Sequence, residues 1–400
     1  ADRYEVIAAG WPASHNYHEF SFNLVPFNGS LYFTTSVPLK SGVTMYEPSA
    51  LQADRDNPDA SAFPVPDGPG SVWKCDAKTG ELQAIGRGMR APNGMNLGFD
   101  GQLYCSDNQG AWLPSSKLNR IRLDKPVFYG HQRRPDGQVP SVPPVAWFPQ
   151  GEIGNSPSQP ILIPDGPYRG QMLVGDVTYG GLQRVFIEKV AGEYQGCVFR
   201  FSQGIEAGVN RLVWGPDGCL YVGGVGSNGN WNHNNTKFGL QRLRPHWNKT
   251  TFEMHRIESR ADGLLLTLTK PVPESILTDA AHYQVATFRY QPTVDYGGPK
   301  VDFTARPIRR LTASPDRMRV FLEIPDLAAG TIAYLRLRDF KSDDGDEPFS
   351  TEAWYTLNAI SHTAGPGFDK PVKRELRPTA PPAGATVLFD GTTLDHFSRL

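Results

Sequence analysis

Short stretches of alternating apolar and polar residues recur along residues 1–245, and three of them share one pattern. In each, a strand-like run leads to Asn-Gly or Asp-Gly and then to a Leu-Tyr pair; the runs cover residues 20–33, 95–105 and 211–222. Asn-Gly and Asp-Gly supply the positive φ angles that a two-residue hairpin turn requires. The pattern therefore predicts three β-hairpins, with a looser fourth copy at residues 168–176.

The spacing of these copies predicts a repeat architecture. The intervals between Leu31, Leu103 and Leu220 are close to two and three steps of the roughly 40 residues typical of a propeller blade. An ordinary β-sandwich with similar hairpins is the alternative. We expect residues 1–245 to form a β-propeller of about six blades, whose innermost strand ends converge on a polar hub where binding residues belong.

Beyond residue 245 the β-rich segments follow one another at short spacing, which is typical of a sandwich. These segments are residues 263–269, 283–290, 319–324, 333–337 and 353–358. We expect an all-β chain in which an immunoglobulin- or fibronectin-like β-sandwich fills residues 246–360. A linker rich in Pro, Gly and Ala is predicted at residues 361–385, and residues 386–400 have the pattern of the opening strand of a truncated further domain.

Charge and composition limit the classes of binding partner that we expect. The chain has 40 Lys and Arg residues against 41 Asp and Glu residues, for a net charge of −1, so its overall field gives no reason to expect nucleic acid or an anionic membrane. Its 41 glycines and 35 prolines, with 39% hydrophobic residues, indicate short strands joined by loops and no membrane span. The first residues lack the features of a signal peptide, so an export signal has been removed or lies outside the sequence.

The four cysteines, Cys75, Cys105, Cys197 and Cys219, show no C-x-x-C spacing. This spacing excludes the usual zinc, thioredoxin-like and c-type haem motifs. Structural thiols and disulfides both remain open, and Cys197 with Cys219 would suit neighbouring strands of one blade.

Several motifs resemble a known family. Residues 90–95 (RAPNGM), 106–112 (SDNQGAW) and 128–131 (FYGH) resemble the propeller of large multidomain secreted bacterial proteins that are related to glucose/sorbosone dehydrogenases. The resemblance continues through residues 154–158, 175–181 and 204–211. It implies a carbohydrate-handling propeller in a secreted or periplasmic protein, with a saccharide or polysaccharide as partner and contacts with other domains of the parent chain.

The two ends of the sequence carry further resemblances. Residues 2–6 look like the middle of the family propeller, so blade sequence is expected to be missing upstream. Residues 388–394 (LFDGTTL) resemble the opening strand of the 3-keto-disaccharide hydrolase domain, a concanavalin-like sandwich. That resemblance implies a parent protein that cleaves 3-keto-glycosides as a hydrolase or lyase, with the cleaving domain almost wholly absent from these residues.

Soluble sugar dehydrogenases similar to this propeller use pyrroloquinoline quinone (PQQ) with calcium, and a histidine just before the repeat hairpin acts as the base. Here the matching stretch holds Val209, Asn210 and Arg211. An amide cannot take a proton from a sugar hydroxyl as an imidazole can. Saccharide binding is therefore the leading hypothesis, PQQ- and calcium-dependent sugar oxidation the runner-up, and a non-catalytic scaffold the third.

Polar residues at the predicted strand ends are the candidates for the hub, because carboxylates, amides and arginines suit sugar hydroxyls or a hard cation such as calcium. The candidate catalytic residues are His131, Asp176, Glu206 and Arg211. The candidate substrate-binding residues are Arg90, Asn93, Asn108, Gln109, Asn210 and Trp231. The candidate metal ligands are Asp107 and Asp176.

Each candidate also has a structural interpretation. An Asp after a blade strand commonly ties a turn through its own backbone, which applies to Asp107 and Asp176. His131 would equally serve as a hydrogen-bonded core or rim histidine.

For the remaining candidates the alternatives are evenly open. Glu206 and Arg211 would form either a buried ion pair or a substrate clamp. Trp231 lies in a polar loop, where it would stack on a pyranose ring or belong to an ordinary surface loop.

Overall fold

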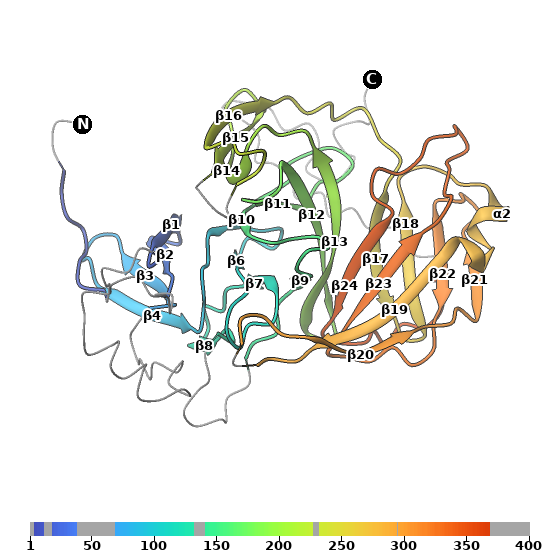
Figure 1. The fold of residues 1–400 in the computed structure, drawn as a ribbon, viewed down its shortest axis with the longest axis horizontal. Coiled ribbons are helices and arrows are strands. Elements are labelled where there is room, and N and C mark those ends of the chain that lie inside the picture. Colours follow the sequence, from blue (N-terminus) through green and yellow to red (C-terminus); the bar gives the residue numbers. More distant parts are fainter. Residues whose placement is uncertain are drawn as a thin grey trace, which may run out of the picture. The chain divides into compact units, whose positions relative to one another are not determined.

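The computed structural model describes residues 4–11, 18–37, 69–131, 141–226, 232–293 and 295–368. Residues 1–366 form one compact unit, and the rest of the chain forms a second. Within the described residues the predicted all-β architecture is confirmed (Figure 1), since the helical segments are only α2 (Glu274–Leu277) and η1 (Ala280–His282). No helix in these ranges is long and apolar enough to cross a membrane. The strand predicted at 386–400 and most of the predicted linker lie outside the described residues.

Four antiparallel sheets follow one another along the first part of the chain, and we call them blades 1 to 4 (Figure 1). Blade 1 contains β1 (Ser21–Phe27), β2 (Ser30–Thr35), β3 (Val72–Asp76) and β4 (Leu82–Arg87), with β8 (Val127–Phe128) added in parallel to β4. Blade 2 contains β5 (Gly94–Leu97), β6 (Leu103–Asp107), β7 (Ser116–Arg120) and β9 (Ala146–Phe148). Blade 3 contains β10 (Pro157–Leu162), β11 (Met172–Asp176), β12 (Gly181–Val190) and β13 (Glu193–Gln203). Blade 4 contains β14 (Gly208–Trp214), β15 (Leu220–Val225) and β16 (Phe238–Leu243).

The three predicted hairpins are confirmed as β1–β2, β5–β6 and β14–β15. In the first, Asn28 and Gly29 have φ angles of 48° and 75°, the two positive values of the turn whose twist matches a hairpin. The repeated Leu-Tyr pair sends its side chains to opposite faces of the sheet. Tyr32 therefore packs towards blade 2 and Tyr104 towards blade 3, in the apolar cores between successive blades.

The described residues contain four blades, fewer than the six or so that the spacing predicted. The interval from Leu31 to Leu103 spans one blade step, because residues 38–68 intervene between β2 and β3. The interval from Leu103 to Leu220 spans two steps, since it includes the long strands β12 and β13, of 10 and 11 residues. Among the described residues, successive hairpins are therefore farther apart along the chain than a repeat of about 40 residues predicts.

Blade 4 has one apolar face without a neighbouring blade among the described residues. Its other face packs on blade 3 through Leu212 and Val222. The open face carries Val213, Phe238 and Leu240, which are exposed to 59%, 79% and 76%. The described blades therefore form a propeller-like succession, β1 against β5, β5 against β10 and β10 against β14.

The second module is a sandwich, and all five strands predicted for it are present. One sheet has the order β17 (Met254–Arg260), β18 (Gly263–Leu268), β22 (Arg319–Glu323) and β21 (Arg310–Ala313). The other has the order β24 (Glu352–Leu357), β23 (Thr331–Leu337), β19 (Tyr283–Tyr290) and β20 (Lys300–Ala305).

Blade 3 and the sandwich share a sheet, which the sequence did not predict. The outer strand of blade 3, β13, pairs with β24, so one eight-stranded sheet runs from β10 to β20. Cys197 and Phe199 of β13 are buried in the same core as Leu264 and Leu335 of the sandwich. The outer strand of blade 3 therefore also serves as a strand of the sandwich.

All four cysteines are buried free thiols. Cys197 lies in β13 of blade 3, whereas Cys219 directly precedes β15 of blade 4. The suggested pairing of these two residues on one blade is therefore wrong, because the chain places them in different sheets.

Candidate functional site

Three of the predicted hub residues meet where the innermost strands of blades 2 and 4 begin. Asn93 precedes β5, and its side-chain amide donates a hydrogen bond to Oδ1 of Asn210 on β14, at 2.9 Å. Nη1 of Arg211 donates to Oδ1 of Asn93 at 3.1 Å and to Oδ1 of Asn210 at 3.0 Å. Burial lowers the pKa of Arg211 from its usual value. We call Asn93, Asn210 and Arg211 the hub.

The backbone packs closely at two glycines beside the hub. The inner strands approach so closely that a Cβ at Gly94 would lie 2.1 Å from Cα of Gln159, and a Cβ at Gly208 would lie 1.7 Å from the carbonyl oxygen of Val177. The hub side chains form hydrogen bonds with one another. Amides and a guanidinium group cannot act as a base near neutral pH. The hub therefore stabilises the meeting of the blades.

Asp107 and Asp176 play the same structural part in blades 2 and 3. Each ends the second strand of its blade, and its carboxylate accepts hydrogen bonds from backbone amides just before the first strand. Asp107 accepts from Arg90 and Ala91 at 2.8 to 3.0 Å. Asp176 Oδ2 accepts from residues 155 and 156 at 2.8 and 3.0 Å, and its Oδ1 accepts from the backbone and hydroxyl of Thr178.

The oxygens of Asp107 and Asp176 accept hydrogen bonds mainly from backbone amides, which agrees with the turn-tying interpretation. The roles of Asp107 and Asp176 as metal ligands, and of Asp176 in catalysis, stay predictions. No group of three or more His, Cys, Asp or Glu residues in the described ranges is arranged to hold a metal ion.

His131, Arg90, Asn108 and Gln109 lie in and around a loop cluster of blade 2, apart from the hub network. Nδ1 of His131 lies 2.7 Å from the carbonyl oxygen of Ala111. Burial, with the nearby charge of Arg90, lowers the pKa of His131 to about 3. An imidazole with this pKa is a weak base, and its burial and its contact with Ala111 agree with the interpretation of His131 as a core histidine. A catalytic role for His131 stays a prediction.

The three other residues of this cluster hold loops together. The side-chain amide of Asn108 donates to the carbonyl of Ala91 at 2.8 Å, and that of Gln109 donates to the carbonyl of Pro114 at 2.9 Å. The guanidinium of Arg90 lies 5.2 Å from the ring centre of Tyr296, in the second module.

Glu206 and Arg211, both among the described residues, do not form the buried ion pair that was one of the two interpretations, and the substrate clamp stays a prediction. Glu206 is exposed, and its backbone N–H donates to the side chain of Gln241 at 2.7 Å. Arg211 instead bonds to the hub amides. Trp231, the predicted stacking residue, lies outside the described residues.

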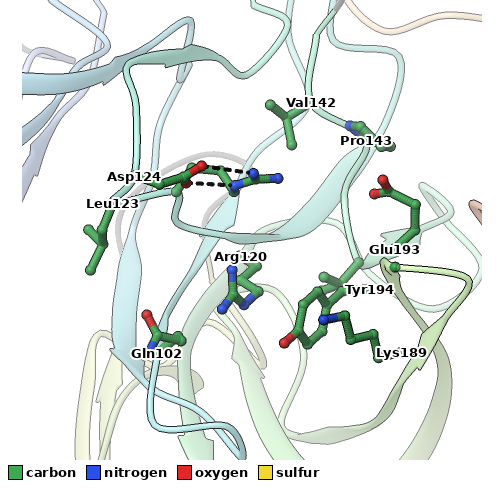
Figure 2. Close-up of a pocket in the computed structure, with 12 residues that line it drawn as sticks. Gln102, Arg120, Leu123, Asp124, Val142, Pro143, Lys189, Glu193 and Tyr194 are labelled. Carbon is green, nitrogen blue, oxygen red and sulfur yellow. Dashed lines mark hydrogen bonds and ion pairs between the residues drawn. The ribbon is translucent and has the colours of Figure 1, made fainter.

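A cavity of about 370 Å³ lies at the opposite end of the blades, between blades 2 and 3 (Figure 2). We call it the inter-blade cavity. Blade 2 contributes the β5–β6 turn and the segment after β7, and blade 3 contributes the β12–β13 hairpin. In Figure 2, Leu123 and Asp124 lie across from Lys189, Glu193 and Tyr194. Its lining residues are Gln102, Arg120, Arg122, Leu123, Asp124, Val142, Pro143, Val145, Lys189, Gly192, Glu193 and Tyr194.

Charged groups surround the ring of Tyr194 in this cavity. The guanidinium of Arg120 lies 4.4 Å from the ring centre, and Nζ of Lys189 lies 5.4 Å from it. Such cation–π contacts fix the ring in place. Arg120 is held in turn by Asp100, with an Nε to Oδ2 distance of 2.8 Å.

Across the cavity, Arg122 binds Asp124 through two hydrogen bonds of 3.0 and 3.1 Å. This pairing lowers the pKa of Asp124 to about 2. The cavity wall therefore offers ionised acceptors and cationic donors together, and the three lining cations face two lining carboxylates.

No residue of this cavity was predicted from the sequence. The predicted residues were polar residues at one set of strand ends, whereas the cavity forms at the other set from turns of two blades. One local signal existed: Lys189 and Tyr194 face each other across the β12–β13 hairpin, a cation and an aromatic ring in register.

Comparison with protein-family models finds no matching family, and comparison with curated proteins finds no match. Among solved structures, the chain is similar to an oxidoreductase (glucose dehydrogenase) from Thermus thermophilus, with 20% identity, a TM-score of 0.36, and coverage of 54% of this chain and 62% of that one. The PQQ domain of a pyranose dehydrogenase from Coprinopsis cinerea has 11% identity and a TM-score of 0.34, with coverage of 59% of this chain and 72% of that one. A protein described as a gluconolactonase has 15% identity and a TM-score of 0.27, with coverage of 88% of this chain and 92% of that one.

The chain thus spans less than two thirds of the glucose dehydrogenase named first. At these TM-scores the likenesses carry no argument about what this chain binds or does.

Proposed function

We propose that this protein binds a saccharide in the inter-blade cavity. The observation that carries the proposal is the wall of that cavity, where an aromatic ring, Tyr194, is surrounded by hydrogen-bond donors and acceptors. A sugar presents C–H faces that pack on aromatic rings and hydroxyls that donate and accept hydrogen bonds, so it needs both kinds of group side by side.

The size and charge of the cavity fit this ligand class. A volume of about 370 Å³ falls in the range of ligand-binding clefts, roughly 300 to 1,000 Å³. Arg122 is already neutralised by Asp124, and Arg120 by Asp100. The paired charges favour a neutral, polyhydroxylated ligand over a multiply charged one, because little net charge is left to attract an anion.

The proposal moves the binding site away from the predicted axis. Sugar oxidation by a quinone is supported by no residue of the hub, because Asn210 and Arg211 cannot act as the base. Cleavage of 3-keto-glycosides and secretion rest on the sequence resemblances alone. They stay predictions, and the residues that suggested the cleaving domain lie outside the described part of the chain.

Titration calorimetry with a panel of mono- and oligosaccharides tests the proposal. We expect at least one sugar to bind, and we expect Tyr194→Ala to weaken that binding by about tenfold or more, which corresponds to about 1.4 kcal/mol. Tyr194→Phe keeps the ring and should bind within a few-fold of the original protein. Failure of every sugar to bind, or equal binding by Tyr194→Ala, would contradict the proposal.

A further inference from the structure

A second, smaller cavity lies where blade 2 meets the sandwich. Its volume is about 110 Å³. Blade 2 supplies Trp112, Lys117 and Trp147 to its wall, and the sandwich supplies Tyr290 of β19 and Ile332 of β23. The rings of Trp147 and Tyr290 pack together with their centres 5.3 Å apart. We call this space the lysine cavity.

Lys117 is the charged group of the lysine cavity, and it is 2% exposed. Its Nζ donates a hydrogen bond to the carbonyl oxygen of Tyr129 and lies 5.6 Å from the ring centre of Trp147. Within the described ranges, that carbonyl is its only hydrogen-bond acceptor. An ammonium group carries three N–H donors, so Lys117 has donors left for a further acceptor.

Lys117 faces Asp107 in the β6–β7 register, and both residues are buried. Burial lowers the pKa of Lys117 to about 8, an effect that the charge of Asp107 partly opposes. Roughly a tenth of the amine is therefore neutral at pH 7, far more than for an exposed lysine. A neutral, desolvated lysine amine is a nucleophile towards carbonyl carbon.

Trp112 supplies a second unused donor. Its indole N–H is buried and has no hydrogen-bond partner among the described residues. Its backbone has a positive φ of 60°, and its N–H donates to the carbonyl of Thr293 in the sandwich at 2.7 Å. A non-glycine residue adopts this conformation at a cost of roughly 1 kcal/mol or more, so contacts between the two modules hold the indole at the cavity wall.

We propose that the lysine cavity binds a small aldehyde or ketone and that Lys117 forms an imine with it. Two donors, Lys117 Nζ and Trp112 Nε1, call for an oxygen acceptor. A neutral carbonyl suits the site better than a carboxylate, because Asp107 already balances Lys117 and an added buried charge would be costly. The cavity is smaller than the roughly 150 Å³ that holds benzene, which limits the ligand to a few carbon atoms.

The covalent step needs no oxidant or reductant. The neutral Nζ attacks the carbonyl carbon, a C–N bond forms, and protonation of the oxygen gives a carbinolamine. Loss of that oxygen as water, with the two hydrogens of the amine, leaves the C=N bond. Asp107 lies across from Lys117 in the sheet, and its charge favours the protonated form of the amine.

Reductive trapping tests this inference on the unmodified chain. The protein is incubated at pH 7 with glycolaldehyde and cyanoborohydride, and the modified lysines are located by peptide mass mapping. We expect Lys117 to be labelled at least tenfold faster than Lys189, which is exposed. Labelling of Lys117 no faster than of Lys189 in the folded protein would overturn the proposal, and this comparison requires no variant.

Two variants sharpen the result. Lys117→Arg keeps a cation in the cavity but cannot form an imine, so the fast adduct should disappear while the slow surface adducts remain. Trp112→Phe keeps an aromatic ring and removes the N–H, and it should slow the labelling of Lys117 several-fold. An unchanged rate in Trp112→Phe would remove the indole from the site, and a persisting fast adduct in Lys117→Arg would place the reactive amine elsewhere.

Discussion

The two ends of the blades use similar residues for different purposes. At the hub, Asn93, Asn210 and Arg211 bond to one another, and the backbone packs closely at the neighbouring Gly94 and Gly208. At the other end, arginines paired with acids stand around a cavity of about 370 Å³ with Tyr194 in its wall. Polar side chains gathered at strand ends therefore indicate a binding site only where they also leave space.

The largest expected effect is at the hub end, where buried carboxylates tie the blades. Asp176→Ala should lower the free energy of unfolding by about 4 kcal/mol, because it leaves several buried N–H and O–H donors without an acceptor. Urea denaturation measures this loss. The matched change at the cavity end, Asp124→Ala, removes an exposed carboxylate and should change stability by less than about 0.5 kcal/mol.

Similar losses in Asp176→Ala and Asp124→Ala would break the comparison. They would mean that the hub-end carboxylates do not carry more of the stability than the cavity-end ones.

At the cavity end, a buried carboxyl group links blade 3 to the sandwich, and it should make the stability of the protein depend on pH. Glu188, next to the cavity residue Lys189, accepts hydrogen bonds from the backbone of Ser259 and the hydroxyl of Tyr355. Burial raises the pKa of Glu188 to about 7. Because the folded pKa lies above the unfolded one, this contribution to stability is present at low pH and is lost as the pH rises through about 7.

Glu188→Gln cannot ionise, so it should escape this loss. Between pH 5 and pH 8 its free energy of unfolding should gain about 2 kcal/mol relative to the original protein. Urea denaturation across this range, with the exposed Glu193→Gln as control, measures the difference. Parallel pH profiles for Glu188→Gln and the original protein would show that the carboxyl is not held in its buried, neutral form.

The smallest effect on stability among the hub-end changes is expected for a substitution of Arg211. Arg211→Met removes hydrogen bonds between partly exposed groups and should cost about 1 kcal/mol of stability. Its saccharide affinity, measured by calorimetry, should equal that of the original protein. A tenfold loss of affinity would show that the saccharide binds at the hub and not in the inter-blade cavity.

The sequence predicted what depends on neighbouring residues. The β1–β2 hairpin follows from Asn28 and Gly29, whose backbone preference decides the turn locally. The β-rich segments of the sandwich likewise became strands. The described residues hold four blades, whereas the spacing of Leu31, Leu103 and Leu220 predicted about six, because three positions alone do not reveal how many residues separate successive strands.

The candidate site depends on contacts between residues that are distant in the sequence, and only some of these contacts were predicted. Asn93 and Arg211 do meet, yet the sequence could not show that their side chains bond to each other and to Asn210. Tyr194 was missed because its cavity forms only when turns of two blades come together. Such a cavity leaves no continuous motif in the chain.

A crystal structure of the protein with a bound oligosaccharide tests the central claim most directly. The account predicts a sugar ring between blades 2 and 3, in contact with Tyr194 and hydrogen-bonded to side chains of the inter-blade cavity. A sugar bound beside Asn93 and Arg211, with the inter-blade cavity empty, would contradict it.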